Sequence, residues 1–297
     1  MARDENHWAP EGIGDVMLAL HADEQPTSCV LAALSMAAKL EAELQVVRVL
    51  PEGSRLRRTS PLFESEAEIE KRRAAHTMTV NWLLSELGEA ARFIRVVVAE
   101  GDFVEQVARR AKSQQLRLIV VSPEVRRAGA VVTSLARAAR TPVLGPRSGG
   151  RGGPILAATD MSHPAFPVLW EAALLARQLA APLVTFHNIP QNILVPPHPV
   201  IIPDLVMIGA ATPPEARRER LTDVTSLLPI PSTPVVRSEV DAVDAILGEA
   251  ATIRAELIVV GTHYRSWWDR AFSVSVAAEI VGRARRSVLV TPIGQAS

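Results

Sequence analysis

The fold class follows from residues 257–292, LIVVGTHYRSWWDRAFSVSVAAEIVGRARRSVLVTP. An apolar run, LIVV, ends at Gly261 and is followed by a polar loop. Residues 275–281 then have helical spacing, and a second apolar run at residues 288–290 ends before Pro292. This order predicts a buried strand, a glycine turn, a helix and another buried strand, which is half of a parallel α/β unit. Such sheets bind ligands at the carboxyl ends of their strands, where a helix N-terminus offers free N–H groups.

The same pattern occurs twice, at an offset of 139 residues, which is the separation of Ala33 from Ala172. Residues 118–121 and residues 257–260 both read LIVV. Further matched pairs are Leu40 with Leu179, Glu100 with Glu239, Asp102 with Asp241, and Ala111 with Ala250. Because the offset is constant from residue 33 to residue 121, we interpret the chain as a duplicated domain.

Each copy is expected to hold five strands that alternate with helices. The expected strands are 16–20, 44–50, 93–98, 116–121 and 142–144, then 155–159, 183–188, 235–238, 257–260 and 287–291. The expected helices are 29–40, 64–91, 103–112 and 131–139, then 165–180, 214–228, 241–252 and 274–283. This pattern predicts an α/β fold of two tandem, open, five-stranded parallel sheets with helices on both faces. The predicted domains are residues 1–146 and 154–297, joined by the glycine-rich linker RSGGRGG at 147–153.

Composition excludes several classes of protein. Lys+Arg and Asp+Glu both number 32, so no net charge favours nucleic acid or an anionic membrane. Cys29 is the only cysteine, which rules out an intrachain disulfide and favours a reducing compartment. Residues 1–10 lack the apolar core of a signal peptide, and prolines interrupt the apolar residues 193–211. We therefore expect a cytoplasmic protein with no membrane span.

This order of elements, with the residues at the strand ends, resembles the universal stress protein family in its tandem form. The resemblance implies an adenine nucleotide alpha hydrolase-like fold, in which an Asp after the first strand contacts adenine. A G-x2-G-x9-G-S pattern holds ribose and phosphates in that family. In the second copy, Asp160 stands at the acidic position, while Gly261 and Ser275, followed by Val276, match parts of the pattern. Asn188 occupies the second-strand position that in the family usually offers a small apolar contact to the adenine.

Two of the pattern's glycines are missing. Tyr264 and Val274 stand in their places, and larger side chains fill the space that lets backbone approach phosphate oxygens. The first copy departs further, because His21 replaces the acidic residue and Ser122 the first glycine. We expect the first copy not to bind a nucleotide.

Each candidate residue also has a plainer interpretation. Asp160 is at a position where Asp often forms a turn or caps a helix, and Ser275 could be an N-terminal helix cap. Metal binding is disfavoured, because no known ligand spacing fits the three histidines near Asp160, which are His163, His187 and His263. No serine lies in a G-x-S-x-G motif that would support a nucleophilic triad.

Two further groups of residues leave alternatives open. Trp267 and Trp268 are adjacent, so they point in different directions in any regular element; they could cover the phosphate site or contact a partner chain. The arginines that flank the last strand could meet a phosphate or cap helix carbonyls; they are Arg283, Arg285 and Arg286.

The sequence therefore predicts a non-enzymatic stress-response protein with a degenerate nucleotide site that acts through an unidentified protein partner. The alternative is a sensor that binds ATP, AMP or another adenine nucleotide through the second copy. A nucleotide-hydrolysing enzyme is less favoured, because the sequence has no G-x-x-x-x-G-K-[ST] loop. The resemblance also implies a pseudo-dimer within the chain, formed by residues 142–144 and 288–291, and allows a homodimer. Nucleic acid and membrane partners are not expected.

Overall fold

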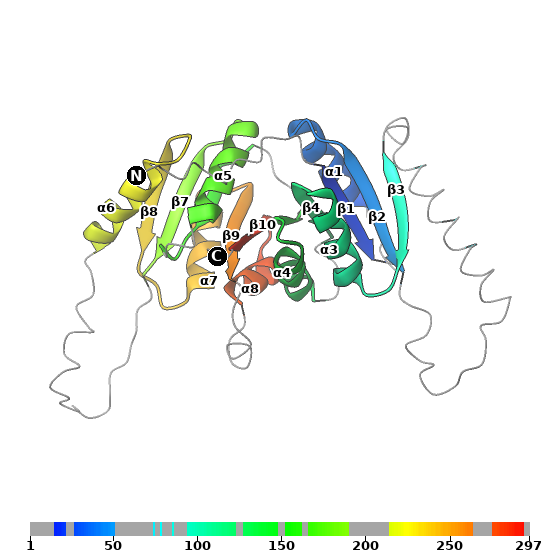
Figure 1. The fold of residues 1–297 in the computed structure, drawn as a ribbon. Coiled ribbons are helices and arrows are strands. Elements are labelled where there is room, and N and C mark those ends of the chain that lie inside the picture. Colours follow the sequence, from blue (N-terminus) through cyan, green and yellow to red (C-terminus); the bar gives the residue numbers. More distant parts are fainter. Residues whose placement is uncertain are drawn as a thin grey trace, which may run out of the picture. The chain divides into compact units, whose positions relative to one another are not determined.

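A computed structural model describes residues 15–21, 27–50, 94–122, 127–147, 152–161, 166–189, 214–263 and 275–293, together with residues 74, 78 and 85. The contacts divide the chain into two compact units, Met1–Ser148 and Gly149–Ser297 (Figure 1). Each unit is described by itself below. Most of the expected helix 64–91 and most of the expected linker lie outside the described residues.

The first unit contains a parallel sheet of five strands in the order β3-β2-β1-β4-β5. Its strands are β1 (Val16–His21), β2 (Leu44–Leu50), β3 (Arg95–Glu100), β4 (Leu118–Val121) and β5 (Val143–Gly145). Its described helices are α1 (Thr27–Lys39), α3 (Phe103–Gln114) and α4 (Ala128–Ala139). The central strands β1 and β4 are short apolar runs, so they are buried on both faces.

The second unit repeats this order as β8-β7-β6-β9-β10. Its strands are β6 (Ile155–Ala158), β7 (Leu183–Asn188), β8 (Ser232–Arg237), β9 (Leu257–His263) and β10 (Ser287–Ile293). Its helices are α5 (Phe166–Gln178), α6 (Pro214–Thr225), α7 (Ala242–Thr252) and α8 (Val276–Arg283). Both units therefore have the predicted α/β fold with parallel strands.

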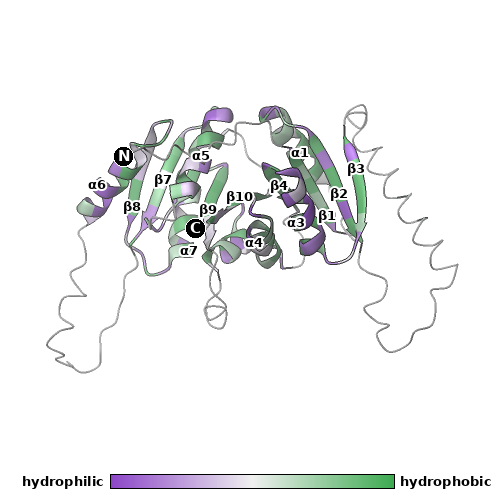
Figure 2. Cartoon of the chain, in the orientation of Figure 1, coloured by the Kyte–Doolittle hydropathy of each residue, from purple (hydrophilic) through white to green (hydrophobic). Residues whose placement is uncertain are grey.

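The strand order places helices on both faces of each sheet. In the second unit the chain moves outward from β6 to β8 and then returns to β9 on the other side of β6. Right-handed crossovers in opposite directions put their helices on opposite faces. In agreement with this rule, α7 packs against α8, whereas α5 packs against β6, β7, β9 and β10. Figure 2 shows that the strands are largely apolar, while polar residues lie on α3 and α6.

The two units also share details of backbone geometry at the offset of 139 residues. Glu41 and Ala180 both have left-handed φ angles, of 51° and 50°, and so do Gln115 and Arg254, at 51° and 53°. Each pair ends a helix at the same place in its unit. Non-glycine residues seldom adopt this conformation, so its recurrence at matched positions indicates that each helix ends in the same way.

The caps that begin two helices match as well. Asp102 precedes α3 and accepts a hydrogen bond from the backbone N–H of Glu105, at 3.1 Å. Asp241 precedes α7 and accepts one from the N–H of Asp244, at 2.8 Å. Each carboxylate satisfies one of the N–H groups that the first turn of a helix leaves without a partner.

The boundaries of most strands differ from the sequence prediction, with the largest shifts at the start of β8 and the end of β9. Gly261 was expected to end a strand as a turn, but it lies inside β9 and its register partner in β10 is Thr291. Pairing with β10 extends β9 as far as His263, which the apolar run does not reveal. The strand β8 begins at Ser232 and contains Pro234, a residue that an edge strand tolerates because one side of it has no ladder to complete.

Within the part of the chain that the structure describes, no helix is both long enough and apolar enough to cross a bilayer.

Candidate functional site at the carboxyl edge of the second sheet

The strand order creates a topological switch point in the second unit. The strand β6 lies between β7 and β9, and the chain runs outward from β6 on one side before it returns on the other. Connections leave the carboxyl ends of β6 and β9 in opposite directions, which opens a crevice where parallel sheets bind ligands. Asp160 follows β6 and Gly261 lies near the end of β9, so both are at this edge.

The turn that carries Asp160 is held by contacts of its neighbours. The Thr159 N–H donates to the carbonyl of Phe186 at 2.9 Å, and the Met161 N–H donates to the Thr159 Oγ1 at 2.9 Å. Met161 has a φ of 60°, a left-handed conformation that costs a non-glycine residue about 1–3 kcal/mol and needs such support. The Asp160 side chain is exposed. The structure therefore presents a carboxylate on a fixed turn at the switch point.

The buried residue His187 contacts this turn, and sequence reasoning considered it only as a metal ligand. His187 Nδ1 is 2.9 Å from the carbonyl oxygen of Thr159. Because a carbonyl only accepts, Nδ1 carries the proton and donates it. Burial lowers the pKa of His187, and the charges of Arg217 and Arg220 lower it further, while the hydrogen bond to Thr159 and the charge of Asp160 act in the opposite direction. The neutral imidazole therefore links β7 to the Asp160 turn.

Asn188 is engaged by the backbone of a neighbouring loop. Its Nδ2 donates to the carbonyl of Glu239 at 3.1 Å, and its Oδ1 accepts from the Glu239 N–H at 3.0 Å. This pair of bonds joins the end of β7 to the segment between β8 and α7. The geometry gives Asn188 a structural role, and its contact with a ligand stays a prediction.

Packing explains the glycine at position 261. A Cβ atom there would lie 2.3 Å from Cδ1 of Ile293 and 2.9 Å from Cγ2 of Val168, and both neighbours are buried. Gly261 is not among the described glycines with positive φ. Sequence reasoning assigned this glycine to phosphate binding, but the close approach of β10 and α5 is sufficient to require it.

Ser275 and Val276 begin the helix α8. Ser275 is the N-cap residue, with φ −62° and ψ 124°, and its side chain makes no capping hydrogen bond. Val276 is 45% exposed. The first turn of α8 therefore keeps backbone N–H groups that the Ser275 hydroxyl does not satisfy, as an anion site at a helix N-terminus requires. Residues 264–274, which include Tyr264, Trp267, Trp268 and Val274, lie outside the described residues.

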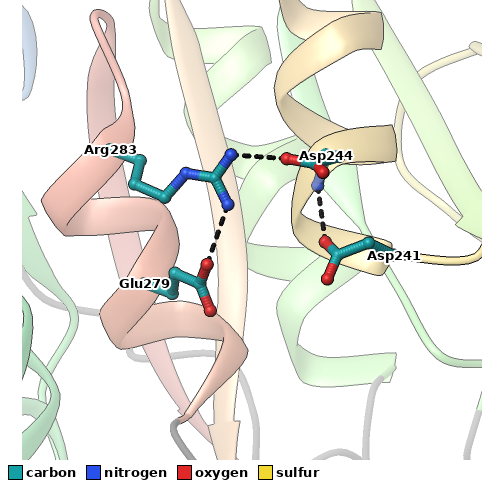
Figure 3. A network of polar contacts seen from close by, with 4 residues as sticks. All are labelled: Asp241, Asp244, Glu279 and Arg283. Carbon is teal, nitrogen blue, oxygen red and sulfur yellow. Dashed lines mark hydrogen bonds and ion pairs between the residues drawn. The ribbon is translucent and has the colours of Figure 1, made fainter.

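An arginine network joins α8 to α7 (Figure 3). Arg283 donates through Nη1 to Oε1 of Glu279 at 2.8 Å and through Nη2 to Oδ1 of Asp244. These two hydrogen bonds raise the pKa of Arg283. The backbone N–H of Asp244 donates in turn to the cap Asp241. Of the two interpretations offered for the arginines near the last strand, Arg283 fits neither, since its guanidinium binds two carboxylates.

The corresponding edge of the first unit is built differently. The ring of His21, at the position of Asp160, lies 5.5 Å from the ring of Phe103, with an angle of 43° between the planes. Phe103 is the first residue of α3 and is buried, whereas the matched residue in α7 is Ala242. An aromatic pair thus fills the place at which the second unit exposes a carboxylate.

Metal binding finds no support among the described residues, which contain no group of three or more His, Cys, Asp or Glu side chains placed to hold an ion. His163 and the side chain of His263 lie outside them.

Comparison with known proteins gives three findings. Residues 153–292 match the model of the universal stress protein family. A search of curated proteins found no match. Among solved structures, a universal stress protein from Archaeoglobus fulgidus covers 95% of this chain and 97% of its own, with a TM-score of 0.65 and 17% identity.

Two structures from Pseudomonas aeruginosa are similar over the same length. One is described as a putative universal stress protein, with a TM-score of 0.62, 19% identity, and coverage of 95% of this chain and 94% of its own. The other is described as functionally unknown, with a TM-score of 0.62, 20% identity, and coverage of 95% and 93%. Residues 153–292 therefore match the universal stress protein family, in a chain that shares its fold with a solved universal stress protein along 95% of its length.

Proposed function

We propose that the chain is a tandem universal stress protein that catalyses no reaction and acts through a protein partner. In this proposal the second unit binds a small adenine-type ligand at the switch point, the first unit binds none, and the bound ligand tunes contact with the partner. The supporting observation is the fixed turn that exposes Asp160 at the carboxyl edge of β6. The matched position of the first unit is occupied by the His21–Phe103 ring pair.

The proposed ligand is smaller than ATP. A triphosphate needs several backbone N–H groups that approach it closely, and glycines usually provide that approach. Tyr264 and Val274 replace two of the three pattern glycines, and packing against Ile293 accounts for the third. Adenosine would need only the Asp160 edge, and the single phosphate of AMP needs fewer N–H donors than a triphosphate.

A nucleotide-hydrolysing enzyme is the second candidate on this fold, and no specific observation favours it. The sequence lacks the phosphate loop that such an enzyme uses. The pairing of the two units through their last strands, the homodimer, the cytoplasmic location and the identity of the partner stay predictions.

Calorimetric titration of adenosine, AMP and ATP into the purified chain tests the ligand. We expect adenosine or AMP to bind more tightly than ATP, and Asp160→Ala to abolish the binding. Asp223→Ala is the matched control, because Asp223 is exposed on α6 and the substitution removes the same charge. Heat from none of the three ligands, or equal binding by Asp160→Ala, would contradict the proposed site. If the chain releases phosphate from ATP and Asp160→Ala abolishes this release, the result would favour the nucleotide-hydrolysing enzyme.

A further inference from the structure

The sheet-facing side of α6 carries an arginine where an apolar residue is expected. Leu221 and Thr225 are buried and lie four residues apart, which defines the face of α6 that packs against β8 and β7. Arg217 is four residues before Leu221, so it belongs to the same face. The next residue, Arg218, is exposed. Two adjacent arginines of one helix therefore have different surroundings.

The Arg217 side chain is partly buried, and its Nε atom is buried without an acceptor among the described residues. Its Nε is inaccessible to solvent, and no described residue accepts a hydrogen bond from it. A buried N–H group without a partner costs about 1–3 kcal/mol, and more when the group is charged. Native proteins rarely keep such a group unless water, an ion or a ligand completes it.

Arg217 has a second positive charge near it on α6. Arg217 and Arg220 are three residues apart, so they are neighbours on the surface of α6, and both act electrostatically on His187. His187 is neutral near pH 7, because burial lowers its pKa. The charge of Asp160 also acts on His187, in the opposite direction. Because Arg220 is exposed, as Arg218 is, the partly buried Arg217 is the residue positioned to hold an additional anion.

Arginine also specifies what kind of anion fits. The guanidinium is planar and presents several N–H groups in a fixed fork, which matches two oxygens of a phosphate better than it matches a monatomic ion. His187 connects this region to the turn of Asp160 through its bond to Thr159. A ligand that reached from Asp160 to α6 would carry its phosphate away from the helix α8, and so would not need the missing glycines.

We infer that Arg217 of α6 anchors a phosphate-binding subsite near the Asp160 turn, which takes free phosphate or the phosphate of a nucleoside monophosphate. The monophosphate form rests on the proposed function, whereas the binding of free phosphate does not.

The test uses the full chain and titrates inorganic phosphate, AMP and adenosine by calorimetry at constant ionic strength. Arg217→Met keeps an unbranched side chain of similar length and removes the charge, and Arg218→Met makes the same change one residue away. We expect Arg217→Met to weaken the binding of phosphate about tenfold or more, because hydrogen bonds to a charged group are lost. Arg218→Met should change it by less than about twofold, as an exposed charge contributes little.

Thermal unfolding without ligand separates a binding defect from a folding defect. Arg217→Met should keep or raise the Tm, because an apolar side chain then completes the buried face of α6. If inorganic phosphate does not bind the unmodified chain, or if Arg217→Met and Arg218→Met bind it equally, the subsite is wrong. A lower Tm of Arg217→Met, with no effect of phosphate on the unmodified chain, would indicate an acceptor from outside the described residues, and would also overturn it.

The three ligands distinguish this inference from the proposed function. If AMP binds and both Asp160→Ala and Arg217→Met weaken its binding, the result supports the subsite and the proposed function. Binding of inorganic phosphate without binding of adenosine or AMP supports the subsite alone. If adenosine binds, Asp160→Ala abolishes this binding, and phosphate does not bind, the result supports the proposed function alone.

Discussion

The two units have the same framework but different carboxyl edges. Their strand order, the N-caps of α3 and α7, and the left-handed ends of two helix pairs correspond at an offset of 139 residues, whereas the caps of α4 and α8 differ. At the edge, however, Asp160 is replaced by His21 and Ala242 by Phe103. Because a buried parallel sheet is specified by its apolar strands and its helix ends, edge residues can change without changing the fold. The comparison teaches that the candidate function has to be sought in these few residues.

The largest effect is expected when the aromatic pair of the first unit is broken. Phe103→Ala should destabilise the first unit by about 3–5 kcal/mol, because the ring is only 7% exposed and packs on His21. Urea unfolding of the full chain would measure this as a separate, earlier transition of one unit. A loss below about 1 kcal/mol would mean that the ring pair is not part of the core of the first unit.

A second prediction places serine, the residue found at position 122 of the first unit, at the matched position 261 of the second unit. Gly261→Ser should cost about 1–3 kcal/mol, because the new Cβ would collide with Ile293 and Val168. The first unit has the smaller Cys29 at the position of Val168, in keeping with its tolerance of Ser122 there. Urea unfolding of each variant measures the cost.

Val168→Cys in the Gly261→Ser background tests whether the collision with Val168 causes the loss of stability. The smaller side chain should restore part of the lost stability, although Val168→Cys alone is destabilising, and a double-mutant cycle would show this as coupling between the two positions. Additive effects of the two substitutions would mean that Val168 does not cause the collision.

A third prediction concerns pH and the second unit only. His187 has a lowered pKa when folded, so the unfolded chain binds the proton first as the pH falls. The stability that the neutral imidazole provides is therefore complete above about pH 6.5, the unfolded value, and is lost as the pH falls from there to the folded pKa. The slope for one proton is at most about 1.4 kcal/mol per pH unit.

His187→Gln keeps a donor for the carbonyl of Thr159 but does not titrate. Unfolding measured between pH 7.5 and 5 should therefore show a smaller loss of stability for this variant than for the unmodified chain. Parallel pH profiles of the two proteins would show that His187 does not contribute. The first unit has Arg48 at the matched position, which keeps its charge over this range, so the effect is specific to the second unit.

Sequence reasoning predicted the framework well, because apolar runs and a constant offset are local and repeated. It placed Gly261 in a turn, since the end of β9 depends on the length of β10, which is distant in the sequence. It also missed the link from His187 to Thr159, since the two residues are 28 positions apart and nothing local connects them. Asp160 was identified through a resemblance, whereas the support of its turn by Thr159 became visible only in the structure.

The smallest effect is expected from the surface charges of the two matched helices. Arg109 pairs with Glu105 on α3 at 2.6 Å, with both side chains more than 60% exposed. In the second unit Asp244 replaces Glu105, and its partner Arg283 belongs to a different helix and also binds Glu279. An ion pair within one helix only supports that helix, whereas Arg283 joins α8 to α7.

Arg109→Met should therefore leave the Tm nearly unchanged, and Arg283→Met should lower it slightly, by an amount that shrinks in 1 M salt because exposed charges are screened. Thermal unfolding of both variants at low and high salt measures the difference. Since Arg283 belongs to α8, the loosened contact with α7 should also weaken the binding of any ligand that uses the first turn of α8. An equal response of the two variants would mean that the contact between α7 and α8 is held by packing alone.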